Sequence, residues 1–186
     1  MLKSLSMKMQ RFSKGWLAAV SLMIFFVFTS RVLPAQTIQA EKYSGEIGSP
    51  DTTFFYSTQD LYRFAEAYGE EGRAAYVRVR ATFDVAWPLV YTFFMVTTIS
   101  WLSAWTFASD SIIHLFNLVP LLAMLFDFLE NGTASLVMLR YPQLSPLAAG
   151  LAPVVSVIKW ALVMGSFGLL VFCLGAALFK RLFRSD

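Results

Sequence analysis

The sequence has few of the residues on which soluble enzymes build redox or metal chemistry. It contains one cysteine, Cys173, in an apolar run, which excludes an internal disulfide and redox chemistry through a cysteine pair. It contains one histidine, His114, with no second imidazole or thiolate at ligand spacing. The sequence also lacks a phosphate loop, a nucleophile elbow, a dinucleotide fingerprint and an internal repeat. We therefore expect no metal and no cofactor.

Charge is also scarce. Only 15% of the 186 residues are charged, against about one quarter in an average soluble domain. Apolar residues make up 57% and aromatic residues 16% of the chain, and a soluble core of this length could not enclose so much apolar surface. The net charge of +3 is too small to imply nucleic acid. The composition predicts an all-α polytopic membrane protein that forms a single membrane domain, 1–186.

Four apolar segments are candidates for the roughly 20 residues that cross a bilayer. They lie at about 15–35, 84–107, 112–139 and 147–179. The first also resembles a signal peptide, because basic residues precede it and Pro34-Ala35 resembles a processing site. Leu33 is large for a cleavage site and Arg31 interrupts the approach to it. We therefore expect the first segment to be retained as an anchor, with cleavage as the alternative.

Basic residues set the expected orientation, because they resist translocation when they flank a span. They cluster at both ends of the chain, at Lys3, Lys8, Arg11, Lys14, Lys180, Arg181 and Arg184. The connection 36–83 holds seven acids against five bases. We expect an up-down bundle of four transmembrane helices in a bacterial inner membrane, with both termini in the cytoplasm and 36–83 as an exported helical loop.

The exported loop contains a helix-start signal. Ser57 and Asp60 have the spacing of a capping box. They predict a short amphipathic helix whose apolar side faces the membrane or the bundle and which ends at Gly69 and Gly72. A second helix is expected to begin at Arg73 and to continue without a break into the second span.

A stripe of polar and aromatic residues runs along that second helix. Its members follow one another at steps of three or four and so share a face: Arg73, Tyr76, Arg80, Asp84, Trp87 and Tyr91. A solvated helix top with interfacial aromatic residues is the alternative, and it is favoured for Arg73 and Arg78 but less so for Asp84. Pro88 has no N–H and frees a carbonyl near Asp84, which is a place for water or a polar ligand.

The third span carries Asp127, Glu130 and Asn131 on one helical face. Ionisable residues are costly inside a membrane, so they are functional candidates that must face protein or water. Lys159 in the fourth span lies at a matching depth, and we expect it to pair with Asp127. Glu130 and Asp84 would then lie nearer the outer surface. A network that only orders the bundle is the alternative.

Several of these residues also carry a resemblance to a family. The patterns are Gly72-Arg73 with Tyr76, then Phe83-Asp84 with Trp87-Pro88-Leu89 and Tyr91, then Asp127-Phe128-Leu129-Glu130-Asn131. They resemble a family of small bacterial four-span membrane proteins of uncharacterised function, over roughly residues 50–165. The resemblance implies a fold and a topology, and it implies no activity.

Three hypotheses of function follow. The first is a carboxylate-rich intramembrane site, open to the outer side, that binds or acts on a lipid or small amphiphile. Its candidate catalytic residues are Asp84, Asp127 and Glu130, and its candidate binding residues are Arg73, Arg80, Trp87, Tyr91, Asn131 and Lys159. The second is a component of proton- or cation-coupled transport. The third is a non-catalytic accessory or assembly subunit. Membrane lipid is the expected partner, with a homo-oligomer or a larger membrane complex as further options.

Overall fold

The computed structural model describes residues 1–44, 47–50 and 53–183, and every regular element among them is a helix. Four helical stretches are long and apolar enough to cross a membrane: Gly15–Gln36, Gly69–Thr106, Ile112–Arg140 and Pro146–Phe183. These stretches overlap the four segments predicted from the sequence, although the second begins at Gly69 rather than at about residue 84. The expected all-α class is confirmed.

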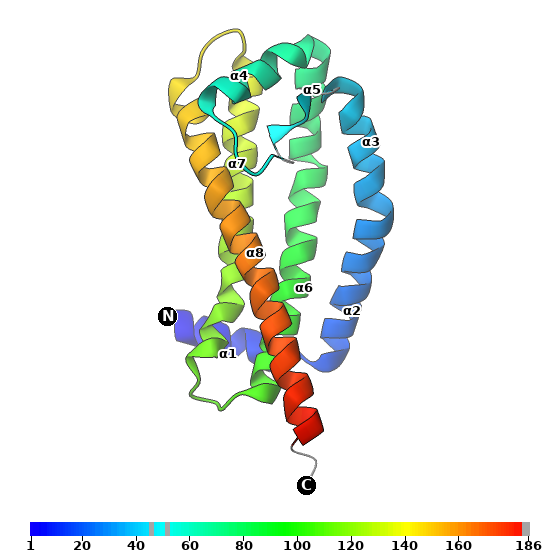
Figure 1. Ribbon diagram of the computed structural model, residues 1–186, viewed down its shortest axis with the longest axis vertical. Coiled ribbons are helices and arrows are strands. Elements are labelled where there is room, and N and C mark those ends of the chain that lie inside the picture. The colour runs from blue at the N-terminus through cyan, green and yellow to red at the C-terminus, as the bar shows by residue number, and fades with distance from the viewer. Residues whose placement is uncertain (45–46, 51–52, 184–186) are drawn as a thin grey trace.

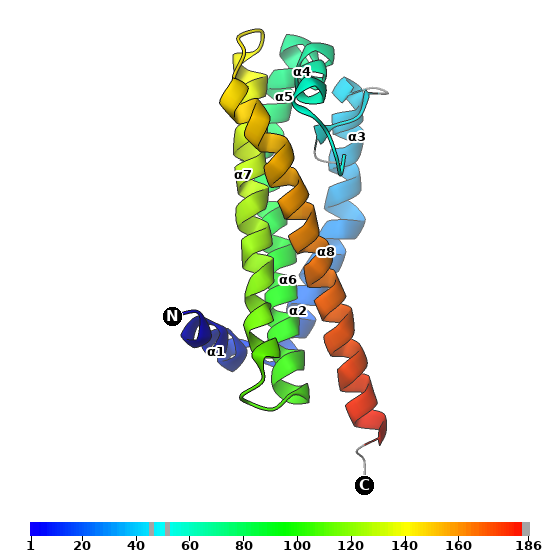
Figure 2. The same ribbon diagram turned by 60° about the vertical axis from the view of Figure 1, so that its left-hand side comes forward.

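The long helices run along the longest axis of the molecule (Figure 1). They are α2 (Gly15–Val27), α6 (Phe83–Thr106), α7 (Val119–Arg140) and α8 (Pro146–Phe183). Helix α6 packs against α2, α7 and α8, so it is the centre of the bundle. Helix α8 crosses the others at a marked tilt in both ribbon views (Figure 2). A π-helical turn, Phe28–Val32, joins α2 to α3 (Leu33–Ser44).

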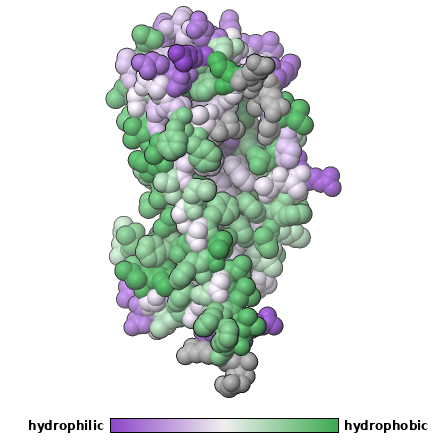
Figure 3. All heavy atoms as spheres, in the orientation of Figure 1, coloured by the Kyte–Doolittle hydropathy of each residue, from purple (hydrophilic) through white to green (hydrophobic). Residues whose placement is uncertain are grey.

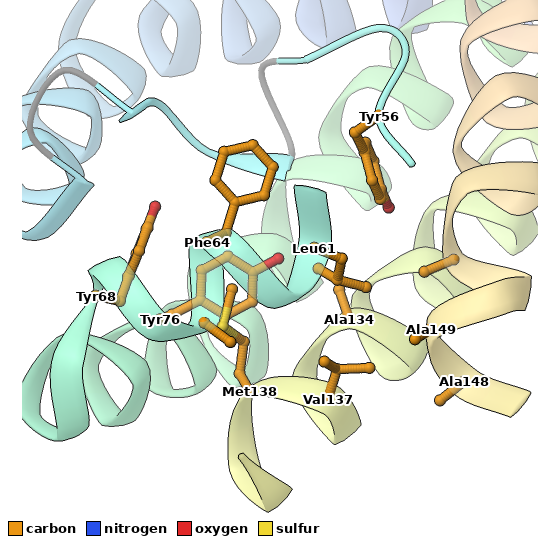
Figure 4. Packing of buried hydrophobic residues seen from close by; sticks show 12 residues of the cluster. Tyr56, Leu61, Phe64, Tyr68, Tyr76, Ala134, Val137, Met138, Ala148 and Ala149 are labelled. Carbon is orange, nitrogen blue, oxygen red and sulfur yellow. The ribbon is translucent and has the colours of Figure 1, made fainter. Parts of the chain in front are cut away.

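Two short helices, α4 (Thr58–Ala67) and α5 (Gly69–Ala81), cover the end of the bundle opposite the C-terminus (Figure 1). We call this end the α4–α5 end and the other the terminal end. The predicted capping box is present, since the Ser57 hydroxyl accepts from the Asp60 N–H at 3.2 Å and the Ser57 N–H donates to the Asp60 carboxylate at 2.9 Å. Leu61 and Ala65 are fully buried. The apolar side of α4 therefore faces the bundle rather than a membrane, as the packing in Figure 4 shows.

The helix that was expected to begin at Arg73 begins at Gly69. A φ of +61° at Gly69 ends α4, because this left-handed conformation favours glycine. Gly72 does not end a helix and lies inside α5, where a Cβ atom would be 3.1 Å from the Cβ of Tyr68. The expected unbroken helix is interrupted at Thr82, whose φ and ψ of −122° and −79° separate α5 from α6.

Hydrophobic residues cover the middle of the face in Figure 3, and hydrophilic residues gather toward its α4–α5 end. This distribution is the one that a bilayer around the long helices requires.

At the terminal end, α1 (Leu2–Phe12) and the 3-10 helix η4 (Ile112–Leu118) complete the fold. A Cβ atom at Gly15 would lie 3.2 Å from the ring of Trp101. The absence of a side chain at Gly15 therefore allows α2 to pack closely against α6.

Candidate intramembrane charged site

Five charged side chains are buried together in the part of the bundle nearer the α4–α5 end. We call them the charged cluster, and they are Arg80, Asp84, Asp127, Glu130 and Lys159. Glu130 is 0% exposed and Lys159 is 5% exposed. An isolated charge at such a position costs several kcal/mol. The bonds within the cluster are therefore what makes its burial tolerable.

Lys159 on α8 forms an ion pair with Glu130 on α7. The predicted pair of Lys159 with Asp127 is thus wrong, because the carboxylate that Lys159 contacts is the one a turn further toward the α4–α5 end. The prediction from matching depths assumed parallel helices, whereas α8 is tilted against α7 (Figure 2) and Lys159 pairs with a residue one turn further along α7 than Asp127. The Glu130 carboxylate also accepts a hydrogen bond from the Tyr56 hydroxyl at 3.2 Å.

Arg80 and Asp84 form the second ion pair, across the break between α5 and α6. Both side chains are only 10% exposed. The guanidinium of Arg80 also lies over the ring of Tyr76, 4.4 Å from its centroid. Arg80 is therefore a buried member of the cluster and not a solvated residue at the top of a helix.

Asp127 is held by neutral donors. Its carboxylate accepts from the Tyr91 hydroxyl at 3.0 Å and from the Asn131 amide at 3.3 Å. Among the described residues, no ion pair includes Asp127. The same Asn131 amide donates to the backbone carbonyl of Asp84 at 3.3 Å. Pro88, four residues later, has no N–H to offer that carbonyl, so the freed acceptor that the sequence indicated is used by Asn131.

Two predicted binding residues lie at or beyond the edge of the cluster. Arg73 donates to the Ala65 carbonyl at 3.0 Å and lies 5.0 Å from the ring centroid of Tyr141, so its guanidinium is not part of the cluster. The ring of Trp87 stacks on the rings of Phe25 and Phe28, with centroids 5.7 Å apart in each pair. It meets the ring of Tyr91 edge-on, with centroids 5.8 Å apart. Trp87 therefore joins the cluster to α2 through aromatic contacts.

The segment just before α4 contributes residues that the sequence did not indicate. Tyr56 donates to Glu130, and Phe54 lies with its ring 4.5 Å from the ring of Trp160 on α8. Burial and the neighbouring Glu130 carboxylate raise the pKa of Tyr56, which keeps it a neutral donor. Neither residue lies on a periodic helical face, so no sequence pattern could have placed them over the cluster.

A cavity of about 70 Å³ lies next to the cluster at the α4–α5 end. It is lined by Tyr43, Ser49, Tyr68, Gly72, Ala75, Tyr76, Val79 and Arg80. Arg80 belongs to both the cavity and the cluster. A larger groove of about 630 Å³ lies at the terminal end, where Phe172, Phe179 and Lys180 are among its lining residues. That groove is far from the charged cluster.

Between the charged cluster and the terminal end lies a mostly apolar layer, which also holds the buried hydroxyls of Ser21 and Thr97, 2.7 Å apart. Met95, Ile99 and Ala123 in this layer are each 0% exposed. Beyond it lies a second polar group, in which the Asn117 amide donates to the Ser100 hydroxyl at 2.8 Å. His114 is also at this end, with its Nε2 atom 2.8 Å from the Ala108 carbonyl oxygen. Within the described ranges, no group of three or more histidine, cysteine or acidic residues could hold a metal ion.

No protein-family model, no curated protein and no solved structure matches this chain. Its chemistry must therefore be argued from the cluster itself. The cluster combines two buried cations, three buried carboxylates and two tyrosine hydroxyls that donate to carboxylates. Such a set can bind a polar or charged group in an apolar environment, where each interaction is stronger than in water.

Proposed function

We propose that this protein is a four-span, up-down helical bundle of a bacterial inner membrane that binds the polar end of a lipid or small amphiphile from the outer leaflet. Basic residues at both ends of the chain support cytoplasmic termini, so the α4–α5 end lies outside. The family resemblance described above is consistent with this topology. The binding site is the cavity at Arg80 together with the charged cluster behind it.

The position of Arg80 is the observation that carries the proposal. It is a buried cation that lines a cavity on one side and pairs with Asp84 on the other. The cavity has the volume of roughly two water molecules, which suits a carboxylate or a phosphate group rather than a whole lipid. A planar guanidinium is well suited to either group. The apolar part of the ligand would remain outside the cavity.

Binding is favoured over catalysis. None of the three candidate catalytic residues, Asp84, Asp127 and Glu130, lines the cavity. Each already accepts a hydrogen bond or belongs to an ion pair. A general acid or base must lie within reach of the reacting group, so the supported role of Asp84 and Glu130 is to position and neutralise the cations of the site, and Asp127 orders Tyr91 and Asn131.

Transport is less well supported. A relay of carboxylates and amines would have to continue across the membrane, whereas the buried side chains beneath the cluster in the described chain include apolar Met95 and Ile99 and the bonded hydroxyls of Ser21 and Thr97. The charged side chains lie nearer the α4–α5 end, which favours a ligand that enters from that end. An accessory subunit would not need a ligand in the cavity at Arg80. Detection of a bound ligand therefore separates a lipid-binding role from an accessory role.

The test is native mass spectrometry of the detergent-solubilised protein, which detects lipid that remains bound after purification. We expect a bound anionic or zwitterionic amphiphile in the wild type and its loss in Arg80→Gln. Arg78→Gln is the matched control, because Arg78 is exposed on the same helix and should keep the ligand. Ala75→Leu fills the cavity without changing any charge and should also release the ligand.

Retention of the same amphiphile by both Arg80→Gln and Ala75→Leu would rule out the cavity as the binding site. Ala75→Leu keeps this test decisive even if the loss of Arg80 destabilises the fold by leaving Asp84 unpaired. A wild-type protein that carries no amphiphile would instead favour the accessory role.

A further inference from the structure

The N-terminal helix α1 is amphipathic and is not used by the site described above. Its large exposed apolar side chains include Leu2, Leu5 and Phe12, which are 64%, 41% and 73% exposed. They follow one another at steps of three and seven residues and so lie on one helical face. No other part of the described chain covers this face.

The exposed surface of α1 away from this face carries three cations, together with Ser4 and Met7. Lys3, Lys8 and Arg11 are exposed, and Lys14 follows the helix. The sequence contains no acidic residue before Glu41. The charge of this segment is therefore not neutralised by neighbours in the sequence, and it is complementary to an anionic surface.

A third face of α1 is attached to the bundle. Ser6 is 1% exposed, and its hydroxyl donates to the His114 carbonyl at 2.7 Å. The Asn117 amide donates to the Ser6 carbonyl at 3.3 Å. These bonds hold α1 across the terminal end of the bundle, at a large angle to α6 and α7 (Figures 1 and 2). A helix in this orientation lies parallel to the membrane surface that the bundle crosses.

We infer that α1 is an interfacial helix that binds the anionic phospholipids of the leaflet at the terminal end. Its Leu2, Leu5 and Phe12 side chains enter the boundary between headgroups and acyl chains, and its lysine and arginine side chains contact lipid phosphates. Ser6 fixes the rotation of the helix, so the apolar and cationic faces are presented to the bilayer together. This inference is independent of any ligand at Arg80.

The experiment places a spin label at single cysteines in the full chain, with Cys173→Ala as the background. Leu5→Cys reports on the apolar face, and Ser4→Cys, one residue away on the exposed polar side, is the matched control. The protein is reconstituted in vesicles of phosphatidylcholine, with or without phosphatidylglycerol. Accessibility to oxygen and to a water-soluble nickel chelate then measures the depth of each label.

We expect the label at position 5 to be accessible to oxygen and protected from the chelate, and the label at position 4 to show the reverse. Phosphatidylglycerol should move the label at position 5 deeper. Replacing Lys3, Lys8 and Arg11 with glutamine should abolish that shift, while thermal unfolding stays unchanged because these side chains are exposed. Equal chelate access at positions 4 and 5 in both kinds of vesicle would overturn the inference. A depth that is insensitive to phosphatidylglycerol would overturn the preference for anionic lipid.

Discussion

The ion pair between Glu130 and Lys159 makes a prediction at the scale of single residues. Lys159→Met leaves the buried Glu130 carboxylate without its cation, and such a loss destabilises a protein by about 3 to 5 kcal/mol. Adding Glu130→Gln should recover much of this free energy of unfolding, because no unpaired charge remains. Unfolding of the four proteins in detergent gives the coupling energy in a double-mutant cycle.

The matched control for this cycle is Asp127→Asn. Asp127 is held by Tyr91 and Asn131 rather than by a cation, so Asp127→Asn should rescue Lys159→Met much less than Glu130→Gln does. Additive effects of the changes at positions 130 and 159 would show that the two residues do not interact.

Asn131 and Pro88 provide a second residue-scale prediction. Asn131→Leu leaves the Asp84 carbonyl without a donor, and a buried unsatisfied group costs about 1 to 3 kcal/mol. Pro88→Ala restores an N–H four residues after that carbonyl. The free-energy cost of Asn131→Leu should therefore be smaller in the Pro88→Ala background than in the wild type. An equal cost in both backgrounds, measured by unfolding in detergent, would mean that Asn131 does not serve that carbonyl.

The capping box of α4 makes a prediction at the scale of an element. Hydrogen bonds from the Ser57 side chain and backbone, together with the nearby Arg63, hold the pKa of Asp60 below its ordinary value of 3.8. A carboxyl whose pKa is lower in the folded state stabilises that state above its unfolded pKa, and the effect is lost as pH falls through the folded pKa. Amide hydrogen-exchange protection in the first turn of α4 should therefore decrease below about pH 3.8.

Two variants check the origin of this pH dependence. Asp60→Asn should remove it and give weaker protection of α4 at neutral pH. Ser57→Ala should reduce it, because the carboxylate loses a donor and the first turn loses its cap. Unchanged pH dependence in Asp60→Asn would assign the effect to another acidic residue.

The orientation of the whole molecule is tested with reporters. A reporter fused after Asp186 and one fused before Met1 should both show a cytoplasmic location, because basic residues at each end resist translocation. A reporter inserted at Gly69, between α4 and α5, should show an extracytoplasmic location. A C-terminal reporter outside the cell would mean an inverted bundle or, with a cytoplasmic N-terminus, an odd number of spans, and either result would reverse the proposed access to the charged cluster.

At the scale of the whole molecule, the sequence alone determined the class of fold. Stretches of apolar residues long enough to cross a bilayer at 1.5 Å per residue are a local property that needs no knowledge of tertiary contacts. The capping box at Ser57 and the carbonyl freed by Pro88 were predictable for the same reason. The shared faces of Asp84 with Tyr91, and of Asp127 with Asn131, followed from helical periodicity.

Tertiary structure decided which of these residues bind one another. Lys159 pairs with Glu130 instead of Asp127 because α8 is tilted. The helical periodicity of this sequence does not specify that tilt. The break at Thr82 and the fold of residues 53–57 then buried Arg80 and brought Tyr56 onto Glu130. Periodicity specifies which residues share a face, whereas crossing angles and loop paths depend on how side chains from different helices pack.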